Sequence, residues 1–155
     1  MTIEEKLTKL GLKLPQPVKP MAAYIPAKRV GDLVFVSGQV PFKDGNLAYV
    51  GKVGAECTQE EGYQAARLCA LNGLAAVKAL VGSLDAISEI VQVRGFVNCT
   101  PDFENQPAII NGASELLVEL YGERGRHARA ALGTSSLPRN VPVEVEMIVH
   151  VGEVS

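Results

Sequence analysis

The chain has 155 residues, of which 47% are hydrophobic and 21% are charged, and its formal net charge at pH 7 is −2. This balance predicts one folded domain over residues 1–155 and excludes an intrinsically disordered chain. Because there is no basic excess, global charge gives no support to nucleic-acid binding.

The first segment, about residues 1–20, is predicted to be an N-terminal extension of the domain. Thr2 can cap a short helix over residues 2–10, which Gly11 would end. The prolines that follow predict an extended linker, because each one fixes φ and removes a backbone donor. These prolines are Pro15, Pro17 and Pro20.

The next segment predicts two strands. Residues 24–27 lead into the first, and residues 32–37 (DLVFVS) are apolar at four consecutive positions. Such a run is typical of a strand that is covered on both faces. The glycine of Ser37-Gly38-Gln39 permits close approach of a ligand or a neighbouring chain, and residues 43–46 (KDGN) predict a hairpin turn.

A long helix is predicted to begin at the capping box of Thr58 and Glu61 and to end near Gly82. Its many alanines indicate close packing against a sheet. After a connection at residues 85–90, residues 91–97 alternate as a strand does, and a second helix follows over residues 107–121.

Two strands are predicted to finish the chain, over residues 129–134 and 143–151. The order of elements favours an α+β fold with two main helices on one face of a mixed sheet. The other face is half apolar and half charged, which predicts a homo-oligomer. Five residues of the last strand should point toward the helices: Val143, Val145, Met147, Val149 and Val151.

The three cysteines, Cys57, Cys69 and Cys99, are odd in number and form no CxxC pair. Their spacing predicts neither a zinc site nor a disulfide framework, so we expect reduced thiols in a cytoplasmic protein. The N-terminal segment MTIEEKLTKLG lacks the apolar core of a signal peptide, and no apolar run is long enough to span a membrane.

Arg129 is the strongest candidate for a functional residue, because it lies inside an apolar strand-like run. Desolvating a guanidinium is costly unless an anion meets it. The partner is either a fixed carboxylate, with Glu144 and Glu146 on the next strand as candidates, or a ligand carboxylate or phosphate that fits the planar fork. Spacing alone leaves the two alternatives open.

Other polar residues give weaker signals. Tyr24 either reaches into a cleft or packs, with packing favoured, and Asn111 is expected to be a surface or capping residue of its helix. The hydroxyls at position 37 and positions 134–136 are better explained by turns than by a catalytic triad, because neither His127 nor His150 forms a motif with them. The nucleotide-binding motifs GxGxxG and GxxxxGK[ST] are absent from the sequence.

Over residues 24–149 the chain resembles the RidA/YjgF family of reactive enamine/imine deaminases, also labelled endoribonuclease L-PSP, as a longer branch. The resemblance rests on Tyr24, on residues 37–41 (SGQVP), on residues 95–97 (GFV) and on Asn111. Its most specific part runs from Ala128-Arg129 through Leu137-Pro138 to residues 143–146 (VEVE).

This resemblance implies a chorismate-mutase-like subunit in a homotrimer, with three clefts at the subunit interfaces. It implies that Arg129 grips a substrate carboxylate and that Glu144 positions a water, and it requires no cofactor or metal. Tyr24, Ser37, Gly38, Asn111 and Ala131 would bind the substrate. Members commonly carry a cysteine two residues after the arginine, where this chain has Ala131.

The implied activity is that of a 2-iminobutanoate/2-iminopropanoate deaminase-like hydrolase, which converts 2-enamine or 2-imino acids to 2-keto acids and ammonia. The alternative is a non-catalytic trimer that binds small carboxylates as a sensor or partner-binding module, which the alanine at position 131 favours. A ribonuclease is disfavoured, because the sequence has no basic groove, no aromatic platform and no histidine pair.

Overall fold

A computed structural model describes residues 1–17, 19 and 22–152. Pro20, the last proline of the predicted linker, lies outside these residues. The helices are α1 (Ile3–Lys9), α2 (Gln59–Val81) and α3 (Gln106–Tyr121). The strands are β1 (Ala27–Val30), β2 (Leu33–Gln39), β3 (Phe42–Lys43), β4 (Asn46–Leu47), β5 (Ile87–Asn98), β6 (Ala128–Thr134) and β7 (Val143–Val151).

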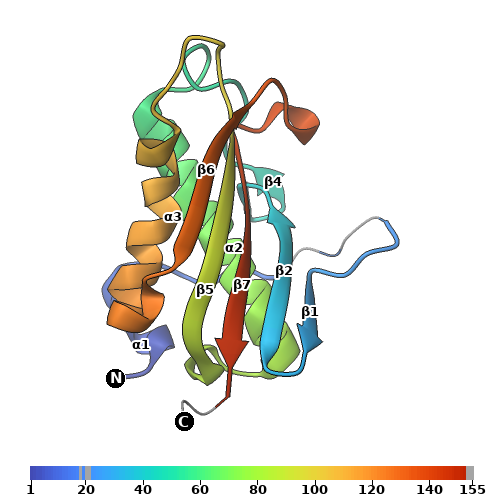
Figure 1. Cartoon of the computed structure of the whole chain (residues 1–155), viewed down its shortest axis with the longest axis vertical. Coiled ribbons are helices and arrows are strands. Elements are labelled where there is room, and N and C mark those ends of the chain that lie inside the picture. The colour runs from blue at the N-terminus through green and yellow to red at the C-terminus, as the bar shows by residue number, and fades with distance from the viewer. Residues whose placement is uncertain (18, 20–21, 153–155) are drawn as a thin grey trace.

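Five strands form one mixed sheet in the order β1-β2-β7-β5-β6. Only β5 and β6 run parallel to each other, and a parallel pair needs a crossover, which α3 supplies. Figure 1 shows α2 and α3 on one side of this sheet, so the predicted α+β layer is confirmed. The strand order places β5 between β6, which carries Arg129, and β7, which carries Glu144.

The sequence signals for the two long helices are confirmed. Thr58 and Glu61 make a reciprocal capping box at the start of α2, and Gly82 ends it in the left-handed conformation. The helices then cross closely, since a Cβ on Gly112 would come within 2.0 Å of the Tyr63 carbonyl oxygen. This close approach fixes α3, which lies beside β6 and carries part of the site described below.

The two faces of the sheet differ in burial. The apolar residues of β7 face the helices and are buried, while its alternate residues are half-buried on the opposite face, as predicted. We call that opposite face the open face, because no described element covers it (Figure 1). It carries exposed apolar side chains, including Phe35 and Leu132, which are 43% and 52% exposed. The expectation that residues 32–37 are covered on both faces is therefore wrong for a single copy.

The middle strand differs from its prediction. Residues 87–90, expected in a connection, belong to β5, and the connection shrinks to a 3₁₀ turn at Leu84–Ala86. Two irregularities in the β5–β7 register, one between Ile87 and Glu89 and one between Ile90 and Gln92, interrupt the alternation. They leave Val91 exposed, although strict alternation would put it on the same face as the buried Val93.

The N-terminal extension is anchored to the domain. Ile3 and Leu7 of α1 are buried, the Glu4 carboxylate lies 2.7 Å from the Lys78 ammonium, and Lys6 donates to the Leu120 carbonyl. The predicted hairpin turn joins β3 to β4, with Asp44 and its neighbour Gly45 at positive φ. Among the described residues, no helix combines the length and the apolar character that crossing a bilayer requires.

The connection between β6 and β7 is held by polar contacts around the buried Asn98 side chain, which the sequence analysis did not identify. Asn98 at the end of β5 donates to the Asn140 side chain (3.0 Å) and to the Val141 carbonyl (3.1 Å). The Lys52 ammonium donates to Asn98 (2.7 Å) and to the Ser135 carbonyl. These contacts fix the point at which β7 begins, one residue before Glu144.

Candidate functional site

Arg129 lies on β6, the edge strand of the sheet beside α3. In the register it pairs with Val93, so its side chain is on the helix-facing side of the sheet. One guanidinium nitrogen, Nη1, donates to the Asn111 side-chain oxygen at 2.7 Å and to the Ser114 hydroxyl at 3.2 Å. Both acceptors are on α3, three positions apart, and therefore share one helix face.

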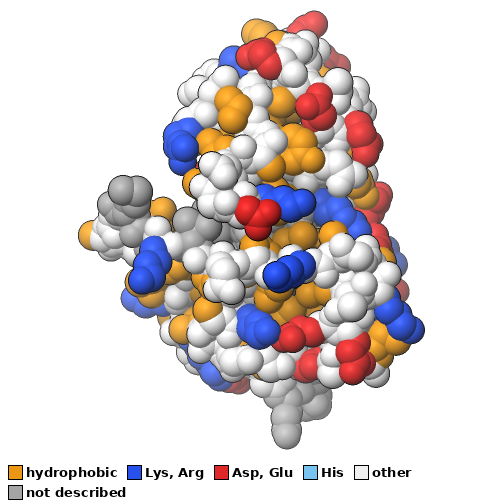
Figure 2. All heavy atoms as spheres, turned by 180° about the vertical axis from the view of Figure 1, so that it is seen from behind, with side chains coloured by type: hydrophobic (Ala, Val, Ile, Leu, Met, Phe, Trp, Pro, Cys, Tyr) orange, Lys and Arg blue, Asp and Glu red, His pale blue; other side chains and the backbone are white. Residues whose placement is uncertain are grey.

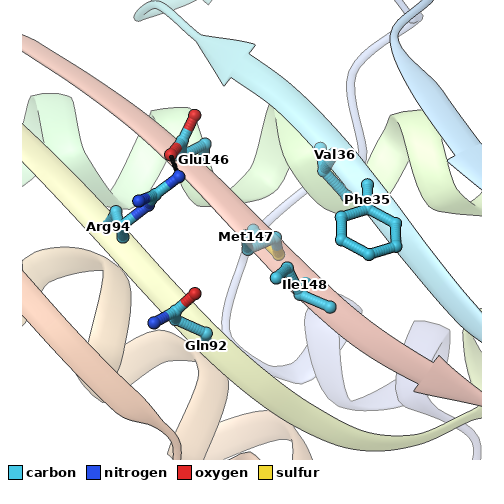
Figure 3. A pocket seen from close by; sticks show the side chains of 7 residues that line it. All are labelled: Phe35, Val36, Gln92, Arg94, Glu146, Met147 and Ile148. Atoms are coloured by element: carbon cyan, nitrogen blue, oxygen red, sulfur yellow. Dashed lines mark ion pairs between the residues drawn. The ribbon is translucent and has the colours of Figure 1, made fainter.

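The partner of Arg129 is thus not a carboxylate of its own subunit among the described residues. Glu146, one of the two predicted ion-pair partners, binds Arg94 of β5 at 2.6 Å instead. Figure 3 shows these two side chains pointing toward each other on the open face. The internal salt bridge is not formed, and Arg129 keeps its charge uncompensated within residues 1–17, 19 and 22–152.

The contacts of Arg129 leave one side of its fork open. Nη1 carries two N–H groups, and each donates a hydrogen bond to one acceptor on α3. Nε and Nη2 have no hydrogen-bond partner in the described part of the chain. These two nitrogens form one edge of the guanidinium, which matches the two oxygens of a carboxylate.

Asn111 was expected to be a surface or capping residue, and it does not cap the helix, because the N-cap of α3 is Asn105. It is half-buried and accepts a hydrogen bond from Arg129. Ser114 and His127 complete the surroundings, with the Ser114 hydroxyl 2.9 Å from Nε2 of His127. No sequence motif indicates this contact, because the two residues approach only when the turn after α3 folds back on the helix.

Glu144 lies on the open face, on the side of β5 opposite to Arg129. It pairs with Phe96 of β5, and its side chain is half-buried. Burial raises the pKa of the Glu144 carboxyl above its ordinary value, and the neighbouring Glu146 raises it further. A carboxyl of this kind can accept and return a proton closer to neutral pH than a solvated glutamate can.

Gly38 lies directly against the Glu144 carboxylate. Its position follows from a bulge in β2, where Ser37 and Gly38 occupy the register interval that β7 fills with Glu146 alone. A Cβ at position 38 would come within 2.7 Å of Glu144 Oε2. The backbone at this position does not have a positive φ, so the conformation alone does not require glycine. Glycine is needed because the Glu144 carboxylate occupies the place of a Cβ atom.

Ser37 and Tyr24 lie on the same side as Glu144. The Ser37 hydroxyl donates to the Ile25 carbonyl at 2.6 Å and thereby ties the segment before β1 to β2. Tyr24, at the start of this segment, is 55% exposed, so the prediction that it packs is wrong for the single subunit. It is next in sequence to Ile25, whose carbonyl accepts from Ser37, the neighbour of Gly38 in β2.

The seven predicted site residues therefore fall into two separate groups. The arginine group lies at the β6 edge on the helix-facing side, and the glutamate group lies at the end of β2 and β7 on the open face. Arg129 and Glu144 are separated by two strand spacings across the sheet, a distance of roughly 10 Å. Along the strands they are also offset by three residues, again roughly 10 Å. The arginine group is Arg129, Asn111 and Ala131, and the glutamate group is Glu144, Gly38, Ser37 and Tyr24.

Ala131 lies two residues beyond Arg129 on the same face of β6 and packs against the core. It offers a ligand no side-chain functional group. In the part of the chain that the structure describes, no three histidine, cysteine or acidic residues cluster as a metal site would require.

Two hollows lie outside both groups. A shallow one of about 150 Å³ on the open face is lined by Phe35, Gln92, the Arg94–Glu146 pair and their neighbours (Figure 3). A broader one, about 970 Å³, lies between residues 11–17, the β3–β4 hairpin and α2 on the helix side. Figure 2 shows that side with basic and acidic side chains interspersed, which is not the continuous basic groove that RNA binding would need.

Residues 4–151 match the model of the YjgF/chorismate-mutase-like endoribonuclease family. Protein TCP17 of Trypanosoma cruzi is 39% identical over 149 residues, which cover 96% of this chain and 93% of that protein. A 2-iminobutanoate/2-iminopropanoate deaminase of Dermatophagoides farinae is 30% identical over 136 residues, covering 87% and 88%.

Solved structures with the same fold are also similar to this chain. The crystal structure of a protein of unknown function from Agrobacterium tumefaciens has a TM-score of 0.91 and 44% identity, and the match covers 97% of this chain and 92% of that one. The E. coli protein TdcF, solved with bound serine, has a TM-score of 0.61 over 90% of this chain and 96% of that one. At 24% identity, the second likeness concerns the fold alone.

Proposed function

The chain belongs to the YjgF/chorismate-mutase-like family, and on this premise we propose that it hydrolyses 2-imino acids to 2-keto acids and ammonia. The proposed site is a cleft between two copies of the chain in a homotrimer. One copy supplies Arg129 with Asn111 and Ala131, and its neighbour supplies Glu144 with Gly38, Ser37 and Tyr24.

The observation that carries this proposal is the open edge of the Arg129 guanidinium. Asn111 and Ser114 hold Nη1, so Nε and Nη2 are oriented for one bidentate ligand. A 2-imino acid presents a carboxylate next to the electrophilic carbon of its C=N bond. Binding of that carboxylate to Arg129 would therefore orient the reacting carbon.

The reaction needs one water and no redox step. Glu144 in its ionised form accepts a proton from water as the water oxygen bonds to the imine carbon. Glu144 returns this proton to nitrogen as the C=N electron pair moves there, and a carbinolamine results. Glu144 then transfers the hydroxyl proton to the amine nitrogen, the C–N bond breaks, ammonia leaves with the bonding pair, and the C=O bond of the 2-keto acid forms. The raised pKa of Glu144 supports this role, because the carboxyl must both take up and return a proton.

The assembly into a homotrimer is supported by the open face. Phe35 and Leu132 are large apolar residues that remain about half exposed in one copy, and β6 is an edge strand with one unpaired side. Contact between copies would cover this apolar surface. It would also bring an arginine group to a glutamate group, which the single subunit keeps apart.

A second function is a non-catalytic trimer that binds small carboxylates as a sensor or partner-binding module. The specific observation in its favour is Ala131, which gives the site no thiol or other reactive group beside Arg129. In this case Arg129 would be required for binding and Glu144 would be dispensable.

The test is an assay of imine hydrolysis, with the imine generated in situ from several amino acids. We expect the wild-type protein to accelerate keto-acid release and Arg129→Ala to abolish it while the assembly persists. Arg126→Ala is the matched control, because Arg126 lies three residues away, is exposed and binds only Glu123 of its own turn at 3.6 Å. Equal turnover by wild type and Arg129→Ala would refute the assignment.

A further inference from the structure

We propose that Ser114 and His127 are positioning residues that fix the orientation of the Arg129 guanidinium for its ligand. This inference rests on the proposed role of Arg129 in binding a carboxylate. Neither residue is in the set that the family resemblance implies. They act through Arg129 and do not touch the ligand themselves.

The contacts form a short chain of hydrogen bonds. Nη1 of Arg129 lies 3.2 Å from the Ser114 hydroxyl, which lies 2.9 Å from Nε2 of His127. At the other side of the ring, Nδ1 lies 2.7 Å from the Gly125 carbonyl oxygen. The chain thus runs from the guanidinium to the backbone of the turn after α3.

The proton positions in this chain follow from its ends. A carbonyl oxygen only accepts, so Nδ1 of His127 carries a proton, and Nε2 of the neutral ring is then an acceptor. The Ser114 hydroxyl therefore donates to Nε2 and presents a lone pair to Arg129. This hydroxyl thus donates on one side and accepts on the other, and rotation of its proton away from Nε2 would break the contact with His127.

The electrostatics favour the same arrangement. His127 is half-buried, and burial lowers the pKa of its imidazole, as does the positive charge of Arg129, while the Gly125 carbonyl opposes both. The neutral ring is the form in which Nε2 can accept. Arg129 thereby keeps a hydrogen-bond acceptor on its α3 side without a carboxylate, and its charge stays available to a ligand.

The fold explains how the turn reaches α3. Gly125 lies against the helix so closely that a Cβ there would come within 2.3 Å of the Leu117 carbonyl oxygen. This contact brings His127, two residues further on, to the helix face that carries Ser114. Asn111 holds the same Nη1 from one turn earlier in α3, so two acceptors fix the plane of the guanidinium, where one would only anchor it.

The experiment first measures how rigidly the Arg129 guanidinium is held, and then the KM and kcat of imine hydrolysis. In the wild type, ¹⁵N NMR should show a resolved Nη signal for Arg129, because the two contacts of Nη1 restrict rotation of the guanidinium group. The signal is assigned by its loss in Arg129→Lys. Ser114→Ala should leave that signal present but mobile, and Ser114→Thr, which keeps the hydroxyl, should restore it. In imine hydrolysis we expect Ser114→Ala to raise KM about tenfold with kcat within about twofold, since a charged hydrogen bond is lost on the binding group.

Three further variants complete the design. His127→Phe should raise KM less than Ser114→Ala, and the double variant should be no worse than Ser114→Ala, because both act through one chain. Ser88→Ala is the matched control: it removes another serine–histidine hydrogen bond, to His150 on β7, and should leave the Arg129 signal and KM unchanged.

An unchanged Arg129 signal and KM in Ser114→Ala, with the wild type active, would overturn this inference and leave the proposed function standing. A wild type that neither hydrolyses imines nor binds 2-oxobutanoate would refute the proposed function itself. An equal loss in Ser114→Ala and Ser88→Ala would show a general structural effect and would also overturn the inference.

Discussion

Arg129 and Glu144 lie on opposite faces of one sheet, with β5 between the strands that carry them. Arg129 points to α3 and Glu144 to the open face, so the two side chains cannot meet in one subunit without unfolding the sheet. Each is next to other residues of the predicted site. A working cleft that uses both must therefore be shared by two copies of the chain.

Replacing Glu144 separates catalysis from binding. Glu144→Gln removes the proton acceptor but keeps the shape of the side chain, so we expect kcat to fall about 10²–10⁴-fold. Affinity for 2-oxobutanoate, measured by calorimetry, should stay within about threefold, because Arg129 is unchanged. Imine turnover that persists at the wild-type rate would exclude the role of Glu144. No turnover by either protein, with affinity for 2-oxobutanoate unchanged in Glu144→Gln, would favour the binding module.

The raised pKa of Glu144 also predicts how stability depends on pH. Because the folded state binds the proton more tightly than the unfolded state, stability falls as pH rises from the ordinary glutamate pKa through the raised one. Glu144→Gln should therefore have a larger free energy of unfolding than the wild type at neutral pH. The difference should shrink on acidification and vanish where both states of the wild type are protonated.

Urea unfolding of the two proteins at a series of pH values, at one protein concentration, measures this difference. If the difference in free energy of unfolding stays constant over the whole pH range, Glu144 has the same pKa in the folded and unfolded states, which would contradict the prediction.

A side chain at position 38 should displace the Glu144 carboxylate. In Gly38→Ala the new Cβ would lie 2.7 Å from Oε2 and 3.0 Å from the carboxyl carbon, so the flexible glutamate must move. We expect imine turnover to fall about 10²-fold through misplacement of the catalytic group, with little change in melting temperature. In the Glu144→Gln background the same substitution should cost no further activity, and an additive loss would contradict this account.

Contact between copies is predicted to depend on the apolar part of the open face. Phe35→Glu places a charge in that surface, so sedimentation velocity should show monomers, and turnover should be lost with the shared cleft. Leu80→Glu is the control, since Leu80 on α2 is 44% exposed, much like Phe35, but lies on the helix side. A Phe35→Glu protein that keeps the wild-type assembly would place the interface elsewhere.

Local signals in the sequence predicted most of the fold. The Thr58 capping box marks the start of α2, and the alternation in residues 143–151 gives the buried face of β7, because both depend on neighbouring residues alone. The start of β5 at Ile87 was missed, since register irregularities interrupt the alternation that would reveal it. Only pairing with β7 shows that those residues are a strand.

The arrangement of the site could be predicted only in part. The apolar sequence around Arg129 indicated that it needs a partner, although the residue is exposed in the single subunit. Its partners Asn111 and Ser114 lie 18 and 15 residues away and meet it through the crossover of α3. Sequence spacing cannot show which strand separates Arg129 from Glu144, because strand order is a property of the whole sheet. The split of the site into two groups follows from that order.

The most direct test of a shared cleft is complementation between two inactive variants. Arg129→Ala and Glu144→Gln chains, co-expressed in equal amounts, should form mixed assemblies in which about a quarter of the seams join an intact arginine group to an intact glutamate group. A shared cleft predicts recovery of about a quarter of wild-type imine turnover, while each variant alone stays inactive. Mixed assemblies with no recovered turnover would contradict it.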